Sequence, residues 1–202
     1  MAKRIAQILS VLFHPLLMPS FGLFWIFNSG TYASYLPFEY QKSLYIIVGI
    51  STFVLPLSII PMFLYKKLIS NVELDKRQDR IIPLIVTLVL FYVDYYLISR
   101  LSAPHIIESF ILSTVIVVLI TLIITIWWKI SAHGAGLGGI AGLLIATSFR
   151  FGVDFSFPLI GIIVISGLVL SSRLFLNAHN SAQVYSGFGL GVIATFISVY
   201  YF

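Results

Sequence analysis

Apolar residues run in seven long stretches along the chain, and short polar segments separate them. Most stretches approach or exceed about 20 residues, the length that an α-helix needs to cross the hydrocarbon core of a bilayer. They cover residues 5–27, 43–65, 81–99, 106–128, 134–149, 157–176 and 178–202. The pattern therefore predicts an all-α fold, a polytopic transmembrane helix bundle of about six to seven spans.

Two of these spans contain two prolines each. Pro15 and Pro19 interrupt the first span, and Pro56 and Pro61 lie inside the second. Proline is tolerated in membrane helices, because neighbouring groups satisfy the backbone, but it usually kinks them. We therefore expect kinks in both spans. The first span is expected to be retained, since no small-residue cleavage site of a signal peptide follows it.

Small residues recur every four positions in two of the later spans. One set is Gly134, Gly138 and Gly142, and the other is Gly187 and Gly191, with Gln183 four positions before Gly187. Residues four apart share one face of a helix, and a glycine face lets two membrane helices approach closely. These faces are interpreted as packing surfaces within the bundle.

The composition excludes an ordinary soluble protein. Apolar residues make up 59% of the chain and charged residues only 9%, against about 25% charged in a typical soluble domain. The longest polar stretch, residues 66–80, is too short to enclose a hydrophobic core. We therefore expect a single integral membrane domain over residues 1–202, with any chemistry at or inside the membrane.

The balance of charged residues indicates which classes of partner the protein binds. Twelve Lys and Arg against seven Asp and Glu give a net charge of +5, but the basic residues lie between apolar runs and form no nucleic-acid-binding face. Lipid headgroups or an anionic substrate explain them better, so membrane lipids are expected partners and nucleic acid is not. The chain has no cysteine, which excludes disulfides, thiolate nucleophiles and thiolate metal sites.

Seven crossings would divide the polar segments between two faces of the membrane. Face A, as we name it, receives the amino terminus and residues 66–80, 128–133 and 173–179, and face B receives residues 30–42, 100–105 and 150–156. Nine of the twelve Lys and Arg belong to face A. By the positive-inside rule, face A is expected in the cytoplasm.

Face A also holds the candidates for chemistry. They are Lys76 and Arg80 in one segment, Lys129, Ser131 and His133 in the next, and Ser172, Arg173, His179 and Gln183 in the last. Phosphoryl transfer needs such a set, because fixed cations and donors must surround the phosphate oxygens. One histidine can attack phosphorus while another protonates the leaving oxygen, so no metal is obligatory. His133 and His179 also stand where a span begins, and helix N-termini favour anions.

The spacing of these residues resembles a known family. Ser172, Arg173 and His179 match Ser-Arg-x5-His-x3-Asp, the third motif of the type 2 phosphatidic acid phosphatase and vanadium haloperoxidase superfamily, with Gln183 in the place of the aspartate. Ser131 and His133 fit its second motif, Pro-Ser-Gly-His. Lys76, Arg80 and Pro83 offer the residue types of its first motif, Lys-x6-Arg-Pro, in a gapped arrangement. The resemblance is concentrated in residues 129–202.

The resemblance implies a membrane-embedded phosphatase that hydrolyses a lipid phosphate monoester or diphosphate through a phosphohistidine, without metal or cofactor. His179 would be the nucleophile, His133 the general acid and Gln183 the acceptor of the nucleophile's N–H. The phosphate ligands would be Arg173, Ser172, Ser131, Lys129, Lys76 and Arg80. The implied location is a bacterial cell (inner) membrane, where such enzymes usually face outward, in conflict with the orientation expected from charge.

Two other functions are compatible with the sequence. One is a catalytically inactive relative that binds a lipid or a protein partner, and the other is a transporter in which Asp94 is the coupling acid. No inverted repeat is visible in the sequence, which disfavours the transporter. Asp94 itself is interpreted as an interface residue among tyrosines and Arg100, and His14 beside Pro15 as part of a kink or a headgroup contact. The oligomeric state is left open.

Overall fold

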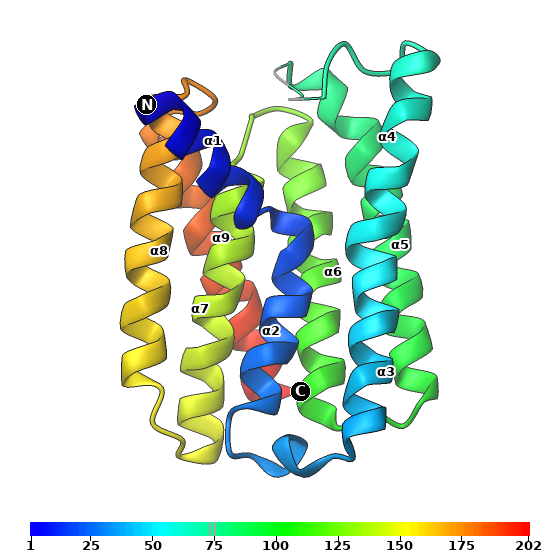
Figure 1. Ribbon diagram of the computed structural model, residues 1–202, viewed down its shortest axis with the longest axis vertical. Helices are drawn as coiled ribbons and strands as arrows, with labels where there is room; N and C mark the ends of the chain where they lie inside the picture. Colours follow the sequence, from blue (N-terminus) through cyan, green and yellow to red (C-terminus); the bar gives the residue numbers. More distant parts are fainter. Residues whose placement is uncertain (73, 75) are drawn as a thin grey trace.

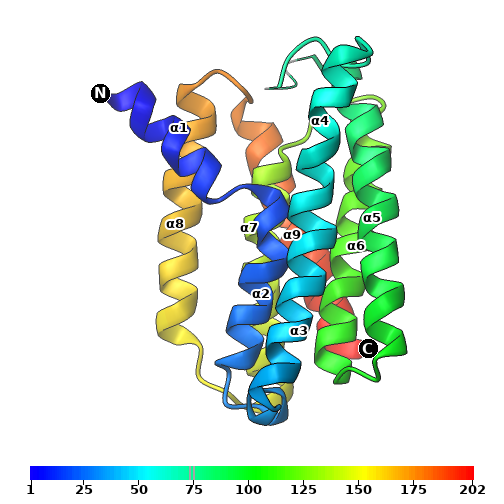
Figure 2. The same ribbon diagram turned by 45° about the vertical axis from the view of Figure 1, so that its right-hand side comes forward.

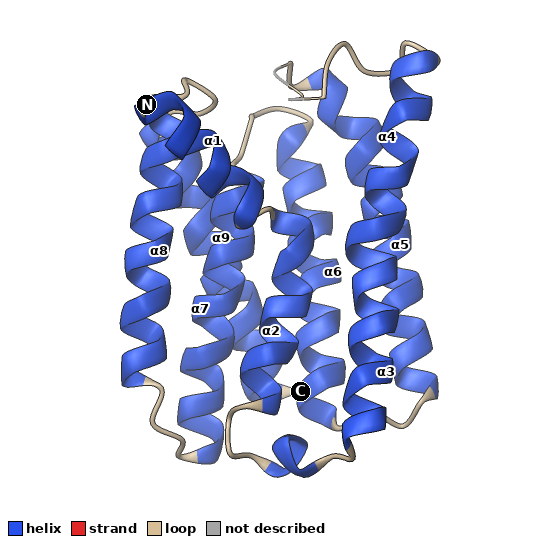
Figure 3. Ribbon diagram, viewed as in Figure 1, coloured by secondary structure: helices blue, strands red, loops and turns tan. Residues whose placement is uncertain are grey.

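The computed structural model describes residues 1–72, 74 and 76–202, so the predicted polar segment 66–80 contains two positions, 73 and 75, outside the described residues. The described residues form helices and no strands, and seven of their helical stretches are long and apolar enough to cross a membrane (Figures 1 and 3). The α-helices are α1 (Ala2–Leu12), α2 (Met18–Phe27), α3 (Phe38–Gly49), α4 (Leu55–Tyr65), α5 (Ile81–Arg100), α6 (His105–Thr125), α7 (Ala132–Phe151), α8 (Ser156–Phe175) and α9 (Ser181–Tyr201). The prediction of an all-α, multi-pass membrane protein is confirmed.

The first span is broken into two helices. α1 lies obliquely across the end of the bundle against α8, and α2 turns inward to run with the other spans (Figure 2). A short 3-10 turn, Pro15–Leu17, joins them, and Pro19 lies in the first turn of α2, where its missing N–H costs no hydrogen bond. The predicted kink is therefore a full change of direction.

The second span accommodates its prolines differently. A π-helical turn, Ile50–Val54, joins α3 to α4 just before Pro56. A π turn is wider than an α turn and can absorb the missing N–H of a proline. Within it, the Thr52 hydroxyl donates to the carbonyl oxygen of Val48 at 2.8 Å and lies 3.2 Å from that of Leu16. This residue connects the π turn to the break in the first span.

Parallel helices α7 and α9 form the tightest pair in the bundle. A Cβ atom at Gly134 would lie 2.6 Å from the carbonyl oxygen of Val184, and one at Gly142 would lie 2.5 Å from that of Val192. From the α9 side, Gly187 and Gly191 likewise face the backbone of α7. The two predicted glycine faces therefore pack against each other, and this close packing places the starts of α7 and α9 side by side at the face A end (Figure 1).

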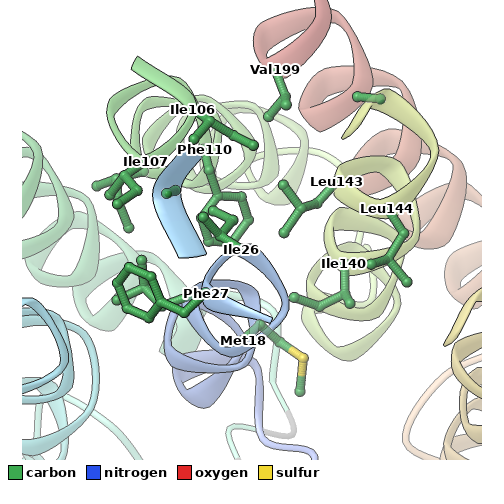
Figure 4. Close-up of a cluster of buried hydrophobic side chains, with 14 of the residues drawn as sticks. Met18, Ile26, Phe27, Ile106, Ile107, Phe110, Ile140, Leu143, Leu144 and Val199 are labelled. Atoms are coloured by element: carbon green, nitrogen blue, oxygen red, sulfur yellow. The ribbon is translucent and has the colours of Figure 1, made fainter. Parts of the chain in front are cut away.

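Below that end the helices pack around a core of buried apolar side chains. Figure 4 shows Ile26 and Phe27 of α2, Phe110 of α6 and Leu143 of α7 in one cluster, all of them almost fully buried. Contacts of this kind hold helices together where lipid supplies no hydrophobic driving force. The core forms the floor beneath the candidate site.

Candidate active site

A cavity of about 450 Å³ extends from the face A end into the bundle. Its polar lining is His14, Arg80, His133, Arg173 and His179 together with several threonines. The rest is apolar and comes from the first span and from α4, α5, α6 and α7, including Ile60, Phe63, Leu84, Phe91, Val117 and Phe110. Thr125 and Phe110 both line it on α6, and at about 1.5 Å per residue they are roughly 22 Å apart. The cavity thus reaches through more than half of a hydrocarbon core of about 30 Å.

His179 lies between α8 and α9 and is 8% exposed. Its Nδ1 is 3.0 Å from Oε1 of Gln183. The same oxygen accepts the backbone N–H of Asn180 at 3.2 Å, while Oδ1 of Asn180 accepts the backbone N–H of Gln183 at 2.9 Å. This reciprocal capping box fixes the Gln183 side chain at the start of α9. Because the amide oxygen can only accept, Nδ1 carries the proton and Nε2 keeps its lone pair.

The surroundings of His179 keep its imidazole neutral. Burial lowers the pKa of His179 to about 3, and the positive charges of Arg80, Arg173 and Lys129 lower it in the same direction. The hydrogen bond to Gln183 opposes this shift and does not cancel it. At neutral pH the Nε2 lone pair is therefore free of a proton, as a nucleophile requires.

His133 occupies the first turn of α7. Ser131 caps this helix, and its hydroxyl accepts the backbone N–H of Gly134 at 3.2 Å. The backbone N–H of Ser131 in turn donates to the carbonyl oxygen of Gln183 at 3.2 Å, which ties the two helix starts together. Nε2 of His133 lies 3.0 Å from the carbonyl oxygen of Ser10 in α1. Since a carbonyl can only accept, Nε2 carries the proton of the neutral ring and Nδ1 carries its lone pair.

Two arginines bring positive charge to the site. Arg80 donates from Nε to the carbonyl oxygen of Leu74 at 2.9 Å and from Nη1 to that of Ile130 at 3.3 Å. Arg173, in the last turn of α8, interacts electrostatically with the imidazoles of His14, His133 and His179. Fixed cations around a group of imidazoles suit an anionic ligand better than a cationic one.

The other predicted phosphate ligands have different positions. Ser131 and Ser172 are buried, and both hydroxyls form hydrogen bonds with backbone groups. The Ser172 hydroxyl donates to the carbonyl oxygen of Leu168 at 2.8 Å. Lys129 interacts electrostatically with His179 but does not line the cavity. Lys76 is exposed and also lies outside the lining. The phosphate-binding roles of these four residues stay predictions.

His14 is the site residue that the sequence interpretation missed. It lines the same cavity, and its ring lies edge-on to that of His133 with centroids 5.7 Å apart. More than 100 residues separate the two in the chain, so no local spacing signals the contact. The adjacent Pro15 does indicate a break, and breaks in membrane helices occur where backbone lines a cavity or is buried in protein.

Asp94 differs from its interpretation as an interface residue. It is 0% exposed, and within the described residues its carboxyl oxygens have no hydrogen-bond partner of good geometry, although the Ser51 hydroxyl lies beside them. Arg100 instead lies over the ring of Tyr96, 5.1 Å from its centroid. Asp94 does not line the cavity, so it is separate from the candidate site.

The site has no metal-binding cluster and no counterpart that identifies its ligand among the described residues. Among the described residues, no group of three or more His, Asp and Glu side chains could hold a metal ion. No protein-family model, no curated protein and no solved structure matches the chain.

Proposed function

We propose that this protein is a membrane-embedded phosphatase that hydrolyses the phosphate monoester or diphosphate of a lipid. The observation that supports it is the division of one cavity into two chemical zones. Imidazoles and arginines gather at the face A end, and an apolar shaft continues toward Phe110. A lipid phosphate has the same division, with an anionic head at the membrane surface and a long apolar chain below it.

His179 is the proposed nucleophile. Its Nε2 attacks phosphorus, and the bond between phosphorus and the lipid oxygen breaks as the phosphohistidine forms. Arg80 and Arg173 balance the charge on the phosphoryl oxygens. The starts of α7 and α9 add backbone N–H groups and the positive ends of two helix dipoles.

His133 is the proposed proton donor. Once the negative charge of the bound phosphate favours its imidazolium form, it gives the Nδ1 proton to the departing lipid oxygen, while the Ser10 carbonyl oxygen holds the other N–H. Water then attacks the phosphohistidine, returns a proton to His133 and releases inorganic phosphate. The overall reaction consumes one water and yields a lipid alcohol and phosphate.

A second candidate is a catalytically inactive protein that binds lipid phosphates. Gln183 favours it, because a neutral amide fixes the tautomer of His179 but cannot stabilise a positive imidazole by charge. In serine proteases, replacing the aspartate of the triad with asparagine lowers the rate about 10⁴-fold. The same cavity would then serve recognition only.

Phosphate release from a panel of lipid phosphates, measured with the purified protein in detergent and EDTA, tests the proposal. We expect release by the wild type and its loss in His179→Ala, a variant that should still fold. His133→Ala should lower the rate about 10²- to 10⁴-fold for alkyl phosphates, and less for esters with acidic leaving groups. His105→Ala is the matched control, because this histidine is exposed at the opposite end.

Each alternative result has a defined meaning. Binding of lipid phosphates without turnover would favour the second candidate. Wild-type turnover in His179→Ala would contradict the proposed mechanism, and neither binding nor turnover would contradict both candidates.

A further inference from the structure

His14 is a histidine with one ring nitrogen occupied and the other available. It caps the 3-10 turn that breaks the first span, where its Nδ1 accepts the backbone N–H of Leu16 at 3.3 Å. A nitrogen that accepts a hydrogen bond carries no proton, so the neutral ring must be protonated at Nε2. Among the described residues, no acceptor contacts that Nε2 atom, although His14 lines the cavity.

The break in the first span supplies the site with two groups at once. The Ser10 carbonyl oxygen, one helical turn before His14, holds Nε2 of His133. His14 itself meets the ring of His133 edge-on. The first span therefore both orients one imidazole of the site and contributes another.

The protonation states of the imidazoles are complementary. His179 presents a lone pair on Nε2, because Gln183 accepts its other N–H. His14 presents an N–H, because Leu16 donates to its other nitrogen. Around one phosphate group, the first arrangement suits attack on phosphorus and the second suits donation to an oxygen.

We propose that His14 is a phosphate-binding residue of this cavity, a neutral imidazole whose Nε2–H donates a hydrogen bond to a phosphoryl oxygen. The inference rests on the proposed function for the identity of the ligand as a phosphate. It assigns His14 a role distinct from that of His133, since His14 donates without giving up its proton.

Substitution of His14 by asparagine or by glutamine tests the roles of its two ring nitrogens separately. In His14→Asn, the side-chain oxygen takes the place of Nδ1 and preserves the cap, but the N–H toward the cavity is lost. In His14→Gln, the side-chain amide reaches the place of Nε2 and preserves a donor, but the cap is weakened. His105→Asn, at an exposed histidine on the opposite face, is the control for a change of this type.

The measurements are inhibition of turnover by inorganic phosphate, kcat/KM for one alkyl phosphate, and the rise in melting temperature that inorganic phosphate causes. Loss of one hydrogen bond to a charged group should weaken phosphate inhibition and lower kcat/KM in His14→Asn by about 10-fold. His14→Gln should stay within about 3-fold of the wild type, on the same energy scale. The pH profile of turnover should not change in either variant, because a neutral donor does not titrate during the reaction.

Three results would overturn the inference. The first is that kcat/KM and phosphate inhibition in His14→Asn equal those of the wild type, and the second is that they fall equally in His14→Asn and His14→Gln. The third is that inorganic phosphate neither inhibits nor stabilises the wild type. The proposed function can fail separately. If no lipid phosphate is hydrolysed, but inorganic phosphate stabilises the wild type and His14→Gln and not His14→Asn, the phosphatase proposal fails and the role of His14 stands. If His14→Asn lowers kcat/KM for the alkyl phosphate but leaves inhibition by inorganic phosphate unchanged, the ligand that His14 contacts is the lipid and not free phosphate.

Discussion

The side-chain oxygen of Gln183 serves two purposes, because it completes the cap of α9 and fixes the tautomer of His179. Gln183→Glu keeps the length of the side chain and both acceptor contacts while adding a negative charge beside the imidazole that becomes positive during attack. We expect the rate of phosphate release to rise about 10-fold or more, as expected when electrostatic stabilisation of a transition state is restored. Gln183→Leu should lower the rate and, through loss of the cap, the stability by about 1 kcal/mol.

Steady-state rates and thermal unfolding of these variants measure both effects. Asn180→Ala is the control, because it removes the other half of the capping box without removing the acceptor of His179. If the rate is indifferent to both changes at position 183, the contact between Gln183 and His179 has no catalytic role.

Burial of His179 also makes the protein sensitive to acid. Its pKa is lowered from 6.5 to about 3 in the folded protein, so the unfolded chain binds a proton that the folded protein excludes. The stabilising contribution of His179 is therefore complete above about pH 6.5 and decreases as the pH falls toward 3. We expect melting temperatures between pH 7 and pH 4.5 to fall less steeply in His179→Gln than in the wild type. Parallel profiles would contradict the low pKa.

At the scale of elements, the close packing of α7 and α9 determines where the two helix starts lie. Alanine at Gly138 or Gly191 would direct a methyl group into the backbone of the other helix. Such overpacking costs about 1–3 kcal/mol, and it would also separate His133 from His179. We therefore expect lower melting temperatures and lower phosphate release in both variants.

Gly189 is the matched control on the same helix, because a Cβ atom there would meet nothing within 4 Å. Gly189→Ala should be neutral or more stable by up to about 1 kcal/mol, the difference in helix propensity. Equal effects of alanine at positions 189 and 191 would show that general helix propensity, and not the α7–α9 contact, controls stability.

At the scale of the whole molecule, the sequence predicted those features that each segment determines alone. The spans follow from apolar length, the break near Pro15 from the missing N–H, and the glycine faces from a spacing of four. The place of His14 beside His133 and the burial of Asp94 could not be predicted in this way. They depend on which helices become neighbours, and an isolated histidine or aspartate carries no periodic signal of its partner.

The orientation of the molecule is the remaining prediction at this scale. Asn177 and Ser102 are a matched pair, since both are exposed turn residues with positive φ at opposite ends of the bundle. In the cysteine-free chain, Asn177→Cys and Ser102→Cys can be tested with a membrane-impermeant thiol reagent on intact cells. The distribution of Lys and Arg predicts labelling at position 102 and protection at position 177. The reverse pattern would place the candidate site on the outer side, and labelling of both after permeabilisation is the control.

The broken first span has a consequence for the order in which the protein becomes functional during its synthesis. Ser10 and His14 precede His133 and His179 by more than 100 residues, so they leave the ribosome first. At about 5–20 residues per second, roughly ten seconds or more pass before all of them are present. During that interval the amino-terminal helices stand in the bilayer without His133 and His179. A chain released before α9 is made would consequently lack the proposed phosphate site and the proposed activity against lipid phosphates.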